Sequence, residues 1–175
     1  LLCSISNEDP SIVVCPSSLM ENWQNEAKRF APGLKTCIIS GNTDRKQVIK
    51  NLKQYDLAIT SFALLCRDVE EYTNIHFNCV VLDEAQNIKN HRSQSALSCR
   101  ALHASYRLAL TGTPLENSAT DLWSVFEFLI PGLLGSRKHF ESIFKSEDVD
   151  DKQRIATIGK LKPFILRRLK ADVLP

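Results

Sequence analysis

The sequence contains little glycine or proline, the residues that most often interrupt helices and strands. Its 175 residues include 6 glycines and 7 prolines, about half the usual share for a globular chain. Most of the chain is therefore predicted to form regular secondary structure with few long loops. Hydrophobic residues make up 43% and charged residues 24%, which excludes a disordered or fibrous protein and is typical of one soluble domain.

Long apolar runs and a strong net charge are also missing. No run approaches the roughly 18 residues of a membrane-spanning helix, and the first residues have no signal-peptide pattern. No membrane partner is therefore expected. The formal net charge of +2 produces no strong long-range field, so a nucleic-acid partner has to be argued from individual residues.

The cysteines and histidines form no zinc-binding pattern, because the six cysteines include no CxxC pair and none has a histidine at ligand spacing. Cys15, Cys37 and Cys79 lie inside apolar stretches, where a thiol behaves as a small buried hydrophobe. This usage predicts a reduced, intracellular compartment. That compartment would be the nucleoid-associated cytoplasm of a bacterium or the nucleus of a eukaryote.

Short apolar runs alternate with amphipathic stretches over the first two thirds of the chain. The runs predict buried strands at Ser11–Cys15, Thr36–Ser40, Leu57–Ser61, Asn78–Asp83 and Arg107–Thr111. The stretches between them predict helices at Leu19–Phe30, Arg45–Leu52, Phe62–Tyr72 and Gln94–Leu102. Such alternation predicts the α/β class, with a mainly parallel sheet, helices on both faces, and ligands at the carboxyl ends of the strands.

Helical patterns replace this alternation after Pro114. Apolar residues at helical spacing predict three helices: one over Leu122–Ile130, one following Ser136, and one carrying Ile155 to Leu161. We therefore expect an α/β part over residues 1–116 and a helical extension over residues 117–175.

Two adjacent carboxylates, Asp83 and Glu84, follow the apolar run Cys79–Leu82. They are therefore expected at the edge of the sheet where ligands bind. A simple alternative is that Asp83 caps a helix and Glu84 is solvated. Against it, Mg²⁺ is usually held by one or two carboxylates with waters and phosphates, and a second carboxylate can deprotonate a water. The pair suits metal-assisted phosphoryl transfer.

Hydroxyl residues follow three other predicted strands. Thr111, Gly112 and Thr113 end the strand after Asp83, and they could either form a β-turn or sense a terminal phosphate. Ser17 and Ser18, and likewise Thr60 and Ser61, stand where helices begin. Helix capping explains these four, and free N–H groups at the same places also suit the phosphates of a nucleic-acid backbone.

These segments resemble, in order, the motifs of the first RecA-like motor lobe of Swi/Snf-type DNA-dependent ATPases, in helicase superfamily two. The matching segments are Ile12–Leu19 with Asn22 and Trp23 (motif Ia), Leu57–Leu65 (motif Ib), Val80–Asn90 (motif II), Leu108–Asn117 (motif III), Asp121–Ser124 and Pro163–Val173. Each is weak alone, but all six occur in register. The resemblance implies a sheet of the P-loop NTPase type and places the helices after Pro114 in the helical insertion of that lobe.

The resemblance also implies a role for each candidate residue. Asp83 would hold Mg²⁺ and Glu84 would activate the attacking water, while Gln86 with Thr111, Gly112 and Thr113 would couple the nucleotide state to DNA. The residues that would contact the backbone of duplex DNA are Ser17, Ser18, Asn22, Thr60 and Ser61. Gln86 makes the motif a DEAQ variant, which is closer to the bacterial branch, and Arg167, Arg168 and Lys170 would lead to a second RecA-like lobe.

One departure from the family is serious, because the chain contains no GxxxxGK[ST] phosphate-binding loop. The chain also begins at Leu1 instead of Met. We therefore expect a fragment with an incomplete sheet that neither binds ATP and Mg²⁺ tightly nor hydrolyses ATP by itself. Its parent would be an ATP-dependent translocase that moves on duplex DNA or remodels protein–DNA complexes.

Two other functions are compatible with the sequence. The chain could be a non-hydrolysing DNA- or protein-binding module that kept the helicase fold and lost the phosphate-binding loop. It could also be an unrelated Mg²⁺-dependent phosphohydrolase, although that reading leaves the motifs beyond Thr113 unexplained.

Overall fold

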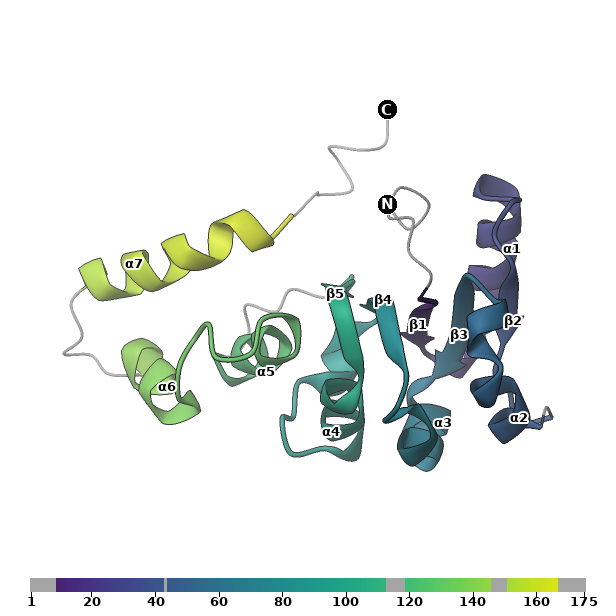
Figure 1. Cartoon of the computed structure of the whole chain (residues 1–175). Coiled ribbons are helices and arrows are strands. Elements are labelled where there is room, and N and C mark those ends of the chain that lie inside the picture. The colour runs from purple at the N-terminus through teal and green to yellow at the C-terminus, as the bar shows by residue number, and fades with distance from the viewer. Residues whose placement is uncertain (1–8, 43, 113–118, 146–150, 167–175) are drawn as a thin grey trace. The chain divides into compact units, whose positions relative to one another are not determined.

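The computed structural model describes residues 9–42, 44–112, 119–145 and 151–166 (Figure 1). The chain divides into two compact units, Leu1–Leu134 and Gly135–Pro175. The first contains the sheet and its flanking helices, and the second contains helices α6 (Arg137–Lys145) and α7 (Asp151–Leu161) with the short 3-10 helix η7 (Lys162–Phe164). Among the described residues, no helix is both long enough and apolar enough to cross a membrane.

Within the described ranges, five parallel strands form one sheet in the order β2-β3-β1-β4-β5, as the labels in Figure 1 show. Their bounds are β1 Ser11–Cys15, β2 Thr36–Ile38, β3 Leu57–Ser61, β4 His76–Leu82 and β5 His103–Ala109. The predicted α/β class and parallel sheet are thus confirmed. Because all strands run the same way, their carboxyl ends lie at one edge of the sheet.

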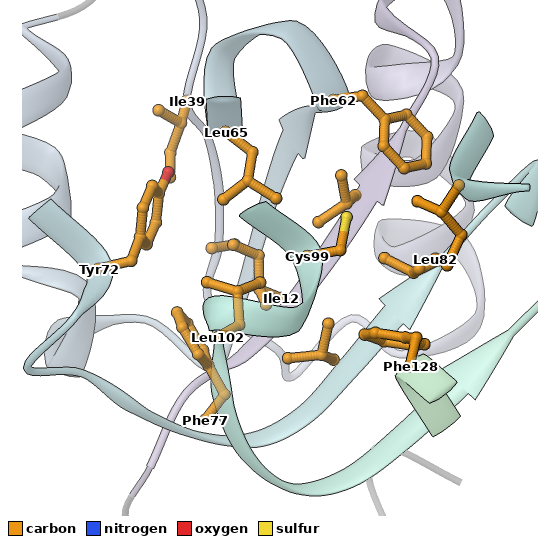
Figure 2. Close-up of a cluster of buried hydrophobic side chains, with 14 of the residues drawn as sticks. Ile12, Ile39, Phe62, Leu65, Tyr72, Phe77, Leu82, Cys99, Leu102 and Phe128 are labelled. Atoms are coloured by element: carbon orange, nitrogen blue, oxygen red, sulfur yellow. The ribbon is translucent and has the colours of Figure 1, made fainter. Parts of the chain in front are cut away.

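Both faces of the sheet are covered by helices. Successive residues of β1 point to opposite faces, and accordingly Ile12 and Val14 belong to one buried cluster while Val13 and Cys15 belong to another. The larger cluster, shown in Figure 2, includes Leu65 and Cys99 from helices on its face. The smaller cluster is covered by the helix that follows β1. Burial on both faces explains why the central strand β1 is apolar from Ile12 to Cys15.

Three helices of the first unit begin at side-chain caps. The helices are α1 (Met20–Phe30), α2 (Arg45–Lys50), α3 (Phe62–Asp68), α4 (Gln94–Ala101) and α5 (Ala119–Leu129), with 3-10 turns η2 (Ser17–Leu19), η3 (Leu52–Gln54), η4 (Val69–Tyr72) and η5 (Ala85–Ile88). Asp44, Ser61 and Ser93 accept hydrogen bonds from backbone N–H groups in the first turns of α2, α3 and α4. Such caps satisfy N–H groups that have no partner within the helix.

Strand β5 lies at an edge of the sheet and differs most from its prediction. It begins at His103, four residues before the predicted Arg107. The first half of β5 is mostly exposed and polar. The apolar run on which the prediction rests begins only at Arg107 and therefore does not include this half. On its smaller-cluster face, Tyr106 is 53% exposed and Leu110, just beyond the strand, is 43% exposed.

Helix α5 belongs to the unit that contains the sheet. Val125 and Phe128 of this helix lie in the larger core cluster. The domain division predicted after residue 116 stays a prediction. The two compact units divide after Leu134, which groups α5 with the sheet. The physical reason is that the apolar face of α5 packs with the sheet's core. In the second unit, Phe140 and Leu161 are buried, and the rings of Phe140 and Phe144 are 4.9 Å apart.

Candidate active site at the carboxyl edge of the sheet

Asp83 sits at the carboxyl edge of the sheet, immediately after β4. Its backbone N–H donates to the carbonyl of Val14 (2.9 Å), and the N–H of Leu110 donates to the carbonyl of Leu82 (2.7 Å). These bonds continue the ladders of β1 and β5 past the ends of the strands. The backbone of Asp83 is thus held from both sides, as the abrupt end of the apolar run predicts.

Two N–H groups orient the Asp83 carboxylate. The indole Nε1 of Trp23, in α1, donates to Oδ2 at 2.8 Å, and the backbone N–H of Glu84 donates to Oδ1 at 2.9 Å. Each carboxylate oxygen can accept a further bond. The side chain is partly exposed, so these remaining acceptor positions are available to a cation or a water.

Glu84 adopts a left-handed backbone conformation, with φ 54° and ψ 54°. It is the single non-glycine residue with positive φ in the described part of the chain. A non-glycine residue pays about 1–2 kcal/mol for this conformation. The sharp turn lets the N–H of Ala85 donate to the carbonyl of Leu110 at 2.9 Å. Strain of this kind is often found at functional sites.

Gln86 joins Glu84 to Thr111 through its side-chain amide. Gln86 Nε2 donates to Glu84 Oε2 at 2.5 Å, and the hydroxyl of Thr111 donates to Gln86 Oε1 at 2.8 Å. A carboxylate can only accept hydrogen bonds, which fixes the direction of the amide. The structure therefore brings together Asp83, Glu84, Gln86 and Thr111 from two neighbouring strand ends.

The other residues predicted to couple the nucleotide state to DNA are less defined. Gly112 follows Thr111 and is exposed. Thr113 lies outside the described residues, as do Arg167, Arg168 and Lys170.

The five predicted DNA contacts divide into two groups. Ser17 and Ser18 in η2 and Asn22 in α1 are exposed. Thr60 is 0% exposed, and Ser61 is 4% exposed with its hydroxyl accepting from the N–H of Leu64 at 3.3 Å. Thr60 is thus enclosed by the protein and the hydroxyl of Ser61 caps α3, while a contact of these two residues with DNA phosphates stays a prediction.

The thiol of Cys15 interacts electrostatically with the Asp83 carboxylate. Burial raises the pKa of Cys15 to about 11, and the Asp83 carboxylate contributes in the same direction. The thiol of Cys15, which lies at the end of β1, therefore stays protonated at neutral pH beside the Asp83 carboxylate.

The donor set at this edge fits Mg²⁺, because Mg²⁺ takes one or two carboxylates and fills its other positions with waters and phosphate oxygens. Asp83 supplies such a carboxylate in a fixed orientation. A cradle for the phosphates of ATP is different, since a loop of backbone N–H groups and a lysine usually supply it. This chain has no such sequence.

Helix α5 is fastened to the candidate site by two polar contacts. The buried hydroxyl of Ser124 donates to the carbonyl of Ile88 at 2.6 Å, in the turn η5 that carries Gln86. Arg107 of β5 donates to the carbonyls of Phe128 and Leu102, both at 2.8 Å. Burial lowers the pKa of the Arg107 guanidinium, and these two acceptors compensate part of that cost.

Three residues that contribute to this geometry could not be identified from the sequence. Trp23 and Ser124 each belong to a matching segment that assigns them no role, and Arg107 is only a charged residue within an apolar segment. One hint was present for Trp23: it is the single aromatic in the first two turns of an otherwise polar helix.

The comparisons with known proteins identify the family. The profile of the SNF2-related domain matches residues 4–175. An uncharacterized ATP-dependent helicase of Mycoplasma genitalium is 41% identical over 167 residues, which cover 94% of this chain and 16% of that protein. The TATA-binding protein-associated factor mot1 of Schizosaccharomyces pombe is 38% identical over 180 residues, covering 94% of this chain and 9% of mot1. The chain thus spans less than a fifth of the length of these relatives.

Solved structures agree with the sequence relatives. The SWI2/SNF2 ATPase core of Sulfolobus solfataricus in complex with double-stranded DNA matches with a TM-score of 0.81 and 41% identity, covering 95% of this chain and 35% of that one. The core domain solved by itself matches with a TM-score of 0.78 and 38% identity. The predicted resemblance and RecA-like fold are confirmed: the chain belongs to the SNF2-related domain family.

Proposed function

We propose that this chain is the metal-binding and water-activating part of an ATP-dependent translocase that moves on duplex DNA. The observation that carries the proposal is the series of hydrogen bonds from Thr111 through Gln86 to Glu84, beside the oriented carboxylate of Asp83. The names of the relatives, which include ATP-dependent helicases and a DNA-bound ATPase core, support it.

Each residue has a chemical task in this proposal. Asp83 holds Mg²⁺, which would neutralise charge on the phosphates of ATP when bound. Glu84 accepts a proton from the attacking water. Gln86 holds the Glu84 carboxylate from one side and is itself held by Thr111. A shift of the turn after β5 would therefore change the orientation of the base.

Duplex DNA is the proposed partner, contacted through its backbone by Ser17, Ser18 and Asn22. All three are exposed on the segment that follows β1, at the same edge of the sheet as Asp83. Polar side chains and free N–H groups suit phosphate oxygens and read no base sequence. The phosphate-binding loop and a second RecA-like lobe with its arginine would come from other parts of a longer protein.

The experiment compares variants of a longer protein that contains both lobes. We expect Glu84→Gln to retain ATP and DNA binding but to lose hydrolysis by at least about a hundredfold, since an amide cannot accept the proton. Asp83→Asn is expected to weaken Mg²⁺-dependent binding as well. DNA-stimulated phosphate release is the measurement, and Glu70→Gln, at an exposed carboxylate on η4, is the matched control.

Two results would redirect the assignment. Turnover of Glu84→Gln within tenfold of the wild type, short of the roughly hundredfold effect of a general base, would remove Glu84 from the base role. A wild-type longer protein that binds DNA without hydrolysing ATP would favour the non-hydrolysing binding module. The 175-residue chain by itself is expected to show no ATP binding by calorimetry.

A further inference from the structure

We propose that Trp23 is a positioning residue for Asp83, and that it links the exposed segment after β1 to the metal-binding carboxylate. The inference rests on the function proposed above and adds a residue to it. The observation is one hydrogen bond, from Trp23 Nε1 to Asp83 Oδ2 at 2.8 Å, between residues that lie 60 positions apart in the sequence.

The direction of this bond is unambiguous. An indole N–H can only donate and a carboxylate can only accept, so no alternative assignment of atoms reverses it. The other oxygen of Asp83 accepts from the backbone N–H of Glu84. With one donor on each oxygen, the carboxylate plane cannot rotate without breaking a bond, and each oxygen still has an acceptor position for a metal ion or water.

Packing alone does not account for a tryptophan at this position. The ring lies, partly buried, against the smaller core cluster that includes Val13, Met20 and Val81. A phenylalanine or leucine could fill apolar space of this kind. The feature that only tryptophan supplies here is an N–H donor at the far end of a large flat ring.

The bond also connects the proposed DNA-contacting segment to the proposed metal-binding carboxylate. Trp23 lies one turn into α1 and next to Asn22. Helix α1 directly follows the turn η2, which contains Ser17 and Ser18. These three exposed residues are the proposed contacts with the DNA backbone. A movement of α1 on binding DNA would shift the indole and, through it, the Asp83 carboxylate, so DNA binding and metal binding are coupled without an intervening residue.

The substitution Trp23→Phe removes the donor and keeps an aromatic ring. Partners that orient metal-ligating carboxylates typically change metal affinity by about 10- to 100-fold when they are lost. We expect Mn²⁺ to bind about tenfold more weakly to the longer protein with a non-hydrolysable ATP analogue, as measured by electron paramagnetic resonance. Affinity for the same nucleotide in EDTA should be unchanged. A residue that acted only through packing would weaken both.

Trp123→Phe is the matched control, because it makes the same change in α5, where the indole ring packs edge-on against His91 at 5.7 Å. It should leave Mn²⁺ affinity within about twofold. The second expected result is a loss of coupling: duplex DNA should strengthen Mn²⁺–nucleotide binding in the wild type and in Trp123→Phe, but not in Trp23→Phe. Equal Mn²⁺ affinities for the two variants would overturn the proposal.

A separate measurement tests the hydrogen bond between Trp23 and Asp83 independently of the proposed function. In the 15N-labelled 175-residue chain, the indole N–H resonance that disappears in Trp23→Phe should move upfield in Asp83→Asn, whereas the resonance of Trp123 should stay. An unmoved Trp23 resonance would refute the orienting bond. If this bond is present but the longer protein binds no Mn²⁺–nucleotide, the proposed function fails and the coupling fails with it, while the orienting bond stands.

Discussion

The backbone of Glu84 provides a test that separates local strain from chemistry. We expect Glu84→Gly to be more stable than Glu84→Ala by about 1 kcal/mol, because glycine adopts the left-handed conformation without the penalty that a Cβ carries. Both variants lack the carboxylate, so both should lose the proposed water activation. Urea unfolding followed by circular dichroism measures the difference.

The same two substitutions at Lys89 are the control for this comparison. It is exposed and ends the same turn in a right-handed conformation, with φ −56°. There Lys89→Ala should be more stable than Lys89→Gly, which is the usual order. The same order at both positions would mean that Glu84 is not strained.

The buried cysteines predict a loss of stability at alkaline pH. Burial raises the pKa of Cys15 and Cys37 from 9.0 to about 11. Between pH 9 and 11 the unfolded chain has released these protons while the folded chain still holds them, so the free energy of unfolding falls as the pH rises. Thermal unfolding from pH 7 to 11 should show this fall, with a smaller slope in a Cys15→Ala, Cys37→Ala variant. An unchanged slope would contradict the assignment.

Among the elements, α5 is held to the site by the hydroxyl of Ser124, which is 0% exposed. Ser124→Ala leaves the carbonyl of Ile88 without this donor and should cost about 1–3 kcal/mol. Ser142→Ala is the control, because it removes a similar hydroxyl-to-carbonyl bond of 2.7 Å from an exposed position in α6 and should cost much less. Tryptophan fluorescence during urea unfolding reports on α5 through Trp123. Equal losses in the two variants would show that Ser124 does not fasten the helix.

The segment formed by η2 and the start of α1 is the element predicted to follow the DNA backbone. Changing Ser17, Ser18 and Asn22 together to alanine should weaken binding of the longer protein to unrelated duplexes by a similar factor. The dependence on salt should keep its slope, because these side chains are uncharged and displace no counterions. Fluorescence anisotropy across salt concentrations measures both quantities.

Asn74→Ala is the control for this surface, since Asn74 is also an exposed asparagine but precedes the amino end of β4. It should bind DNA like the wild type. Unchanged affinity of the triple variant, or a loss confined to one DNA sequence, would show that these residues do not contact the DNA backbone and are ordinary solvated side chains.

Elements with strong local signals could be predicted from the sequence. β1 and β3 have the predicted bounds because both are buried throughout, largely apolar and flanked by strands on both sides. The start of β5 could not be predicted, since an edge strand does not need apolar residues along its exposed half. The burial of Thr60 could not be predicted either, because a hydroxyl at the end of an apolar run looks the same in the sequence whether it points to solvent or into the core.

The candidate site was predictable in part for the same physical reason. Asp83 and Thr111 follow two strands that are consecutive in the sequence, and consecutive strands of such a sheet are usually neighbours. The approach of Trp23 to Asp83 depends on α1 covering the face of the sheet beside β4, and this depends on the strand order. Hydrophobic periodicity carries no information on strand order, so no local signal could place the two side chains together.

At the scale of the whole molecule, β5 leaves one edge of the sheet open in the part of the chain that the structure describes. An open edge with apolar neighbours favours pairing with another chain. We expect the 175-residue chain to self-associate as its concentration rises and Tyr106→Lys to reduce this, because Tyr106 is exposed on β5. Sedimentation velocity measures the association.

Phe30→Lys is the control for this edge, since Phe30 is 72% exposed but lies at the end of α1. It should associate like the wild type. Equal association of the two lysine variants would mean that contacts elsewhere hold the chains together.

The central place of β1 has a consequence for how fast the chain folds. The pairs β2–β3 and β4–β5 join residues 21 and 27 positions apart, as in Thr36 with Leu57 and His76 with His103. β1 instead pairs Ser11 with Leu57 and Ile12 with Val80, 46 and 68 positions away. Closing these longer loops costs more entropy before any contact is gained. The two outer pairs are thus favoured to form first, and the nucleation of the native sheet waits for the earliest strand of the chain to enter between them.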